Sequence, residues 1–157
     1  MDRPREGFTL VETLIVVLIL AILAMAVAPE FATSSQDARD AALVTDLQTV
    51  RQQLLLYKEQ HNGRYPLLDP SGQQDTGSFV DRLTSRTAAD GAIENTGQFG
   101  PYLTEWPSNP FCDAAVAQKI NFGKLETSPR DGTSGWYFST RTSQIYVNSK
   151  DGATSMD

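Results

Sequence analysis

The segment that decides the fold is residues 7–29, GFTLVETLIVVLILAILAMAVAP. Between Phe8 and Ala28 its only charged residue is Glu12. At about 1.5 Å per residue, a helix over this run would be roughly 31 Å long, close to the ~30 Å thickness of a bilayer hydrocarbon core. A carboxylate at the centre of such a helix costs roughly 2.5–3.5 kcal/mol, and somewhat less near its edge. We therefore expect Glu12 to have a specific use.

Gly7 and the run Phe8-Thr9-Leu10-Val11-Glu12, after a short charged leader, resemble the processing and assembly signature of type IV pilins and type II secretion pseudopilins. The resemblance implies that residues 1–7 are a prepilin leader peptide. It also implies that prepilin peptidase cuts between Gly7 and Phe8 and that Phe8 is N-methylated. In such filaments Glu12 would face the Phe8 amine of a neighbouring subunit. An ammonium group there would offset much of the energetic cost of removing the Glu12 carboxylate from water.

Two simpler interpretations of the same segment compete with this one. An ordinary signal anchor would leave Glu12 as a charge without a role. A cleaved secretory signal is suggested by the small-x-small pattern of residues 26–28. Against it, Pro29 follows that pattern, the apolar run exceeds the usual ~7–15 residues, and the leader contains Asp2 and Glu6.

The charges that flank the apolar run predict its orientation. Arg3 and Arg5 precede it and Glu30 follows it, and positive charge stays on the cytoplasmic side of a membrane helix. We therefore expect residues 8–28 to cross the inner membrane once, with the N-terminus in the cytoplasm. Residues 29–157 would then form one periplasmic domain, because their number suits one small core and not two.

The composition gives no sign of an enzyme, a cofactor site or a nucleic-acid site. The net charge of −6 argues against phosphate binding. With one histidine, His61, and one cysteine, Cys112, neither a Cys/His metal site nor an intramolecular disulfide can form. No nucleophile elbow, phosphate loop or dinucleotide fingerprint occurs. We interpret His61 as a residue near a helix C-terminus that faces the helix dipole, and Cys112 as a small buried filler.

Beyond the apolar run, the pattern predicts an amphipathic second half of the helix over about residues 34–61. Pro29 removes a backbone hydrogen bond and clashes with the preceding turn, so we expect a kink or a melted turn there. Ser34 or Ser35 would cap the restarted helix. Gly63 would take the left-handed position that ends it. Apolar residues recur at helical spacing and indicate a single buried stripe: Leu43, Leu47, Val50, Leu54 and Tyr57.

The C-terminal part is expected to form a short helix and a few strands. Residues 79–84 have apolar residues at helical spacing, and residues 119–122 are a short strand candidate. Residues 135–139 and 144–148 are β-prone runs separated by a loop, which is the pattern of a hairpin. The fold class is therefore α+β. A long N-terminal helix, transmembrane in its first half and amphipathic in its second, packs on a small C-terminal antiparallel sheet, as in pilins.

Three further stretches resemble the major pseudopilin of type II secretion: Tyr65-Pro66, Gly100-Pro101-Tyr102-Leu103 and Trp136-Tyr137. The resemblance implies a structural subunit of a secretion pseudopilus, polymerised through its N-terminal helix to drive protein export across the outer membrane. Its partners would be further copies of itself, minor pseudopilins, prepilin peptidase and an inner-membrane assembly platform. The alternatives are a type IV pilus or DNA-uptake pilin, a minor tip subunit, and a membrane-tethered periplasmic binding or enzymatic module.

Major pseudopilins also resemble one another in a C-terminal Ca²⁺ loop built from Asp side chains and backbone carbonyls, the oxygen ligands that suit this hard cation. The matching region, residues 148–157, holds only two carboxylates, Asp151 and Asp157, with Lys150 among them. These two residues are the Ca²⁺ candidates of the sequence. The alternative is a plain Asp-Gly turn with a frayed tail and no cofactor.

Overall fold

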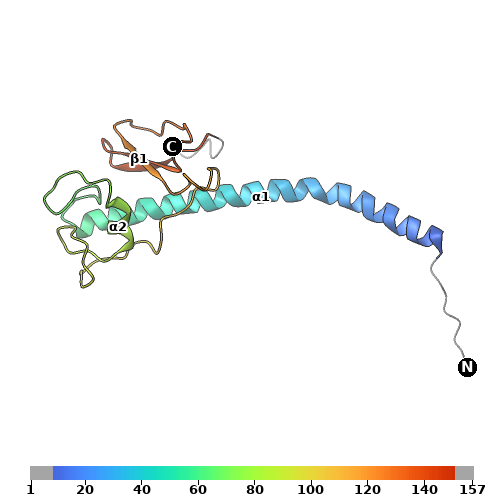
Figure 1. Ribbon diagram of the computed structural model, residues 1–157, viewed down its shortest axis with the longest axis horizontal. Coiled ribbons are helices and arrows are strands. Elements are labelled where there is room, and N and C mark those ends of the chain that lie inside the picture. Colours follow the sequence, from blue (N-terminus) through green and yellow to red (C-terminus); the bar gives the residue numbers. More distant parts are fainter. Residues whose placement is uncertain (1–8, 151–157) are drawn as a thin grey trace, which may run out of the picture. The chain divides into compact units, whose positions relative to one another are not determined.

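The computed structural model describes residues 9–150, apart from the side chains of residues 26–33. The chain divides into two compact units, Met1–Arg39 and Asp40–Asp157. Helix α1 (Leu10–Gln60) belongs to both units. The second unit adds helix α2 (Phe79–Thr84) and the strands β1 (Ile120–Gly123), β2 (Trp136–Ser139) and β3 (Gln144–Val147), which are labelled or coloured by position in Figure 1.

Helix α1 continues through Pro29 without an interruption. The expected melted turn and the capped restart at Ser34 or Ser35 are therefore wrong. A proline removes only its own N–H donor and disturbs the turn before it, so the hydrogen bonds on either side can carry the helix onward. The predicted kink at Pro29 stays a prediction, because this side chain lies outside the described ones.

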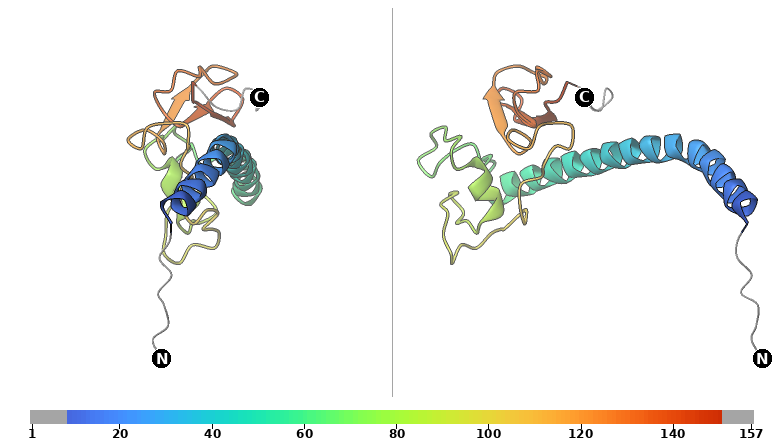
Figure 2. Two further views of the ribbon diagram at one scale, coloured as in Figure 1. Left: turned by 90° about the vertical axis from the view of Figure 1, so that its right-hand side faces the viewer. Right: turned by 45° about the vertical axis from the view of Figure 1, so that its right-hand side comes forward.

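The second half of α1 buries the stripe that the sequence predicts. The side chains of Leu43, Leu47, Val50, Leu54 and Tyr57 are all at most 3% exposed. They share one core with residues of α2, β2 and β3, and Figures 1 and 2 show the sheet lying along this half of the helix. Each such side chain stabilises the folded state by about 1.5–3 kcal/mol when it is fully buried. The stripe therefore holds this half of α1 against the rest of the second unit.

Aromatic rings fill the middle of this core. The ring centroid of Phe79, in α2, lies 5.0 Å from that of Phe138 in β2 and 5.3 Å from that of Phe122 in β1. The rings of Trp106 and Trp136 meet edge to face at 5.8 Å. Tilted and edge-to-face pairs of this kind contribute about 0.5–1.5 kcal/mol beyond the area they bury. These rings therefore belong to one core that joins α2, the sheet and the loop that carries Trp106.

Helix α1 ends in a Schellman motif, one residue earlier than expected. Asn62 has a φ of 55° and Gly63 a φ of 80°. The N–H of Gly63 donates to the carbonyl of Lys58 at 2.8 Å, which is the long hydrogen bond of this motif. Gly63 is left-handed, as expected, but Asn62 before it already takes this conformation and ends the helix. Asparagine tolerates this conformation better than other residues with a side chain.

His61 lies at this helix end, as expected, but as a core residue. Its side chain is fully buried and its ring stacks on Tyr57 at 3.7 Å. Its Nδ1 lies 2.8 Å from the carbonyl oxygen of Tyr57, so it is the nitrogen that carries the proton. Its Nε2 accepts from the hydroxyl of Thr87 at 2.9 Å. Both ring nitrogens are thus satisfied by a neutral imidazole, and burial lowers the pKa of His61.

A buried arginine holds the loop that follows α1. The Arg82 guanidinium, in α2, donates to the carbonyl of Pro66 at 2.9 Å and to the carboxylate of Asp75 at 2.7 Å. Hydrogen bonds from Ser78 and from Arg82 lower the pKa of Asp75 to about 2. One cation therefore ties two points of the loop to α2.

The sheet is mixed and not antiparallel. Strands β2 and β3 form the expected hairpin, with Trp136 opposite Val147. Strand β1 instead pairs with β2 in parallel, with Ile120 opposite Trp136, so the expected antiparallel sheet is wrong for this edge. The reason is the connection. Residues 124–135 return the chain from the end of β1 to the start of β2, and parallel neighbours need such a crossover of about a dozen residues.

The buried stripe gives a first test of the fold. Leu47→Ala should lower the free energy of unfolding of the second unit by about 2–5 kcal/mol, because it leaves a cavity under the sheet. Leu55→Ala removes the same atoms from the same helix, where the side chain is 55% exposed, and should cost less than about 1 kcal/mol. Denaturant unfolding of the full chain in detergent, followed by tryptophan fluorescence, measures both. Equal losses of stability in the two variants would show that Leu47 is not a core residue.

The second test uses the neutral, buried His61. Because its pKa is lowered in the folded state, the unfolded chain takes up a proton first as the pH falls below about 6.5. Stability should therefore fall between about pH 6.5 and the lower folded pKa, and level off below it. His61→Gln, which cannot become charged, should flatten this slope. Melting temperatures measured from pH 7.5 to pH 5 compare the two chains, and identical slopes would exclude His61 as the cause.

Candidate assembly site

The N-terminal half of α1 carries an apolar surface that no other described part of the first unit covers. Every described side chain from residue 9 to residue 25 is exposed, including Leu10 at 84% and Met25 at 80%. From Leu14 to Leu20 every residue is Leu, Ile or Val and at least 48% exposed, so the surface extends around the whole helix. A helix that is apolar on all sides is normally buried, so a surface of this kind marks an interaction site.

A search of the helices in the described part of the chain finds none with both the length and the apolar character that a membrane span requires.

Glu12 lies in the first turn of this helix, next to its cap. Thr9 is the residue before α1, and its Oγ1 accepts from the N–H of Glu12 at 3.3 Å while its carbonyl accepts from the same N–H at 3.1 Å. Thr9 and Glu12 thus have the spacing of a capping box, Ser/Thr-x-x-Glu. A carboxylate is also favoured here by the helix dipole. Sequence reasoning missed the cap that Thr9 forms, although the Thr-x-x-Glu pattern was a signal for it.

The other site residues predicted from the sequence lie outside what the structure describes. Gly7 and Phe8 precede the described residues, and Asp151 and Asp157 follow them. The side chain of Pro29 is among those that are not described. Cleavage, methylation and the helix kink therefore stay predictions from the sequence, and Glu12 is the one predicted site residue whose surroundings are known.

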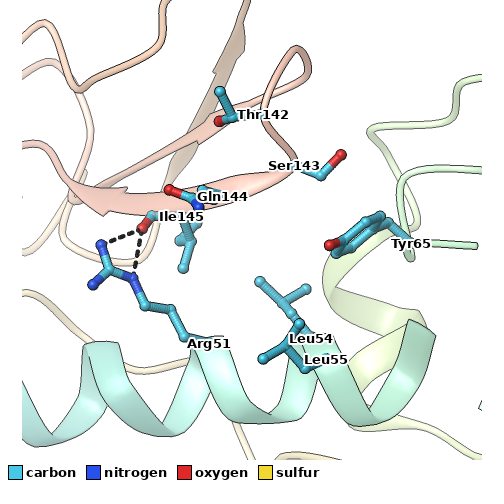
Figure 3. A pocket seen from close by; sticks show the side chains of 8 residues that line it. All are labelled: Arg51, Leu54, Leu55, Tyr65, Thr142, Ser143, Gln144 and Ile145. Carbon is cyan, nitrogen blue, oxygen red and sulfur yellow. Dashed lines mark hydrogen bonds between the residues drawn. The ribbon is translucent and has the colours of Figure 1, made fainter. Parts of the chain in front are cut away.

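A groove of about 320 Å³ lies between the second half of α1 and the β2–β3 hairpin (Figure 3). The Arg51 guanidinium reaches from α1 to β3, where its Nε and Nη2 donate to the carbonyl of Ile145 at 3.2 and 3.1 Å. It also lies 5.8 Å from the ring centre of Tyr146. Leu54, Leu55 and Tyr65 line the groove beyond it. Arg51 is thus a clamp between helix and sheet, and the sequence pattern gave no signal for it.

The chemically reactive side chains of the described residues do not form a catalytic site. Both ring nitrogens of His61 are engaged in the core. The Cys112 thiol is half-buried beside the carbonyl oxygens of Ser134 and Asn148, and burial raises its pKa, which disfavours the nucleophilic thiolate. Among residues 9–150, no three or more His, Cys, Asp or Glu side chains gather into a possible metal site.

The apolar helix, the Thr9–Glu12 cap and the compact α+β unit define a class of protein. A family model described as the prokaryotic N-terminal methylation motif matches residues 2–28, the segment that contains Gly7, Phe8 and Glu12. The chain is thus of the pilin-like class that carries this motif. No solved structure matches the chain.

Comparison with curated proteins identifies the family within this class. The chain is 34% identical over 111 residues to the type II secretion system core protein G of Dickeya chrysanthemi, covering 71% of this chain and 66% of the relative. It is 32% identical over 111 residues to the same protein of Klebsiella pneumoniae, covering 71% of each. The protein of Aeromonas hydrophila is 28% identical over 125 residues, covering 79% of this chain and 80% of the relative. The chain belongs to the family of type II secretion system core protein G, the major pseudopilins.

The matched motif gives a prediction about processing. Gly7→Val should block cleavage after residue 7, because a bulkier side chain would not fit a peptidase site adapted to glycine. Pro4→Val, which adds no bulk at the cut, should be processed normally. Mass spectrometry of the membrane fraction measures the mature N-terminus of each. Equal amounts of chain beginning at Phe8 in the wild type and Gly7→Val would contradict cleavage at this bond.

Proposed function

We propose that the chain is a structural, non-enzymatic subunit of a type II secretion pseudopilus, which polymerises through the N-terminal half of α1 to drive protein export across the outer membrane. The observation that carries the proposal is the apolar surface of residues 10–25, exposed around the whole helix. The methylation motif and the membership of the core protein G family support it. The named relatives favour this function over a type IV pilus or DNA-uptake pilin.

Before assembly, lipid would cover the apolar surface. Residues 8–28 would cross the inner membrane once, with Arg3 and Arg5 holding the N-terminus in the cytoplasm. The second unit would lie in the periplasm, where its buried stripe and polar surface allow it to fold in water. This division of one helix between two solvents explains why its two halves differ so much in composition.

In the filament, the same surface would be covered by the helices of neighbouring subunits. Lipid tails are as apolar as leucine, so helices inside the membrane gain little hydrophobic energy by associating. Once extracted into the aqueous periplasm they would gain about 25 cal/mol for each Å² of apolar surface that they bury against one another. Extraction therefore needs an external energy source, and the assembled filament is stabilised afterwards by packing.

Glu12 would give this packing its register. Leu, Ile and Val side chains around a helix can slide past one another with little loss, whereas a buried carboxylate must meet a partner. Cleavage after Gly7 would create an ammonium group on Phe8, close in sequence to Glu12. The Glu12 of one subunit and the methylated amine of the next then satisfy each other. The first-turn position of Glu12 keeps the carboxylate near the end of the helix where a neighbouring amine would lie.

The partners follow from these steps. Prepilin peptidase would cut and methylate the precursor, and an inner-membrane assembly platform would extract the subunit. Further copies of the chain would form the homopolymer, and minor pseudopilins would join it. The acidic net charge of −6 gives no support to a nucleic-acid partner.

Substitution of Glu12 tests the pairing. Glu12→Leu should still be cut and inserted, since a costly charge has been removed, but filament yield should fall at least tenfold. Loss of one member of a buried pair typically costs about 3–5 kcal/mol, because the amine is left alone in the apolar core. The measurement is the yield of sheared filaments from an overexpressing strain, with membrane level and cleavage as controls.

Glu12→Gln separates this role from helix capping. Glutamine keeps the shape and polarity of the side chain, and the backbone hydrogen bonds to Thr9, but not the charge. If the pairing is electrostatic, Glu12→Gln should assemble as poorly as Glu12→Leu, or nearly so. Wild-type filament yield from Glu12→Gln would show that the charge of Glu12 is not needed for assembly. Normal filaments from both variants would refute a role of Glu12 in assembly.

A further inference from the structure

One buried side chain holds the crossover loop, residues 124–135, in place. Asn148 follows β3 directly and is completely buried. Its own N–H donates to the carbonyl of Gly135 at 3.0 Å, so its position beside the loop is fixed by the backbone. Its side-chain amide makes all of its hydrogen bonds to that loop. Oδ1 accepts from Ser128 Oγ at 2.9 Å and from Asp131 N at 3.2 Å, and Nδ2 donates to Asp131 Oδ1 at 2.8 Å and to Ser134 Oγ at 2.9 Å.

The partners of this amide decide which end is oxygen and which is nitrogen. The N–H of Asp131 can only donate, so it must face Oδ1. Hydrogen bonds from Thr133 and from Asn148 lower the pKa of Asp131, so its side chain is an ionised carboxylate that can only accept and must face Nδ2. Asn148 and Asp131 therefore each donate to the other. If the Asn148 amide were flipped, it would lose both hydrogen bonds to Asp131, and its oxygen would face the Asp131 carboxylate.

The Ca²⁺ candidates of the sequence, Asp151 and Asp157, lie outside the described residues. The described carboxylate that bonds to the start of the same region, residues 148–157, is Asp131, and its surroundings do not fit a Ca²⁺ ligand. Ca²⁺ takes about six to eight oxygen ligands, whereas the group that faces Asp131 here is the N–H donor of Asn148. Asp131 Oδ1 already accepts three hydrogen bonds, two from Thr133 and one from Asn148. The Lys150 stem packs over Gly132, 3.3 Å from where a Cβ would lie, which brings a cationic side chain to the same loop.

We propose that the Asn148 amide takes the place of a divalent cation in this loop. It offers the Asp131 carboxylate a hydrogen-bond donor where a metal would offer a positive charge, and it ties the end of β3 to the crossover between β1 and β2. The crossover loop therefore keeps its fold without Ca²⁺ at Asp131. This inference concerns folding alone and holds whether or not the chain assembles into a filament.

The same geometry places the loop one substitution away from a metal site. Asn148→Asp would set two carboxylates, at 131 and 148, against each other, with the hydroxyls of Ser128 and Ser134 beside them. The carboxylates would repel each other at neutral pH unless a cation lay between them. Ca²⁺ should then stabilise the variant by binding only its folded state.

The experiment measures the melting temperature of the full chain in detergent, in excess EDTA and in millimolar CaCl₂. Fluorescence of Trp106 and Trp136, both buried in the second unit, reports the transition. The wild type is compared with Asn148→Ala and Asn148→Asp. Ser149→Ala is the control for truncation, since Ser149 is the buried neighbour whose hydroxyl has no partner in the described part of the chain. Asn95→Asp adds the same charge at an exposed turn and is the control for the aspartate variant.

The expected result has three parts. The wild type melts at the same temperature in EDTA and in CaCl₂. In EDTA, Asn148→Ala and Asn148→Asp melt about 5–15 °C lower, whereas Ser149→Ala and Asn95→Asp stay near the wild type. CaCl₂ raises the melting temperature of Asn148→Asp and of no other chain.

Three results would overturn the inference. A wild-type chain that gains stability from CaCl₂ holds a metal despite the amide. If Asn148→Ala is as stable as Ser149→Ala in EDTA, the Asn148 amide does not stabilise the crossover loop. An Asn148→Asp chain that folds but does not respond to CaCl₂ shows that the amide does not stand where a cation would. If Asn148→Asp fails to fold, the wild type and Asn148→Ala still decide the first two points.

Discussion

Packing between the apolar stripe of α1 and the inner face of the sheet is the interaction on which the second unit depends. Leu47 and Leu54 lie on the helix side and Phe138 and Ile145 on the sheet side, all within one core. The sheet has only three short strands, and so small a sheet is marginally stable unless one of its faces is covered. The helix provides that cover. Arg51 reinforces the contact with two hydrogen bonds to the Ile145 carbonyl, which orient the helix against β3.

The same helix meets a different constraint in its N-terminal half. There the apolar residues are not confined to a stripe, and all of those described are exposed. One continuous helix therefore has one half covered by its own chain and one half whose described apolar side chains are exposed. Under the proposed function, the folded second unit would pass from membrane to filament without refolding, because only the cover of the first half would change. Glu12 adds a single polar requirement to an otherwise featureless apolar surface.

Polar groups, not apolar ones, organise the loops of the second unit. Arg82 fixes the segment after α1 through Pro66 and Asp75, and Asn148 fixes the crossover loop through Asp131. Both groups are buried, and each bonds to more than one point of its loop. Gly135 shows how closely two backbone segments approach at this point, because a Cβ there would overlap the carbonyl oxygen of Ala117. Such a site needs glycine.

The sequence by itself determined what depends on local pattern. The spacing of Leu43 to Tyr57 specified a buried stripe, the β-prone runs around residues 140–143 specified a hairpin, and residues 7–12 specified the pilin-like class. Only the tertiary structure decided the parallel pairing of β1 with β2, the burial of a neutral His61 and the part played by Asn148. Each of these depends on hydrogen bonds between residues far apart in the chain, such as Asn148 with Asp131 and His61 with Thr87. Periodicity records which face of an element is buried, but not which distant polar group will satisfy a buried donor or acceptor, because that choice is made only when the elements pack.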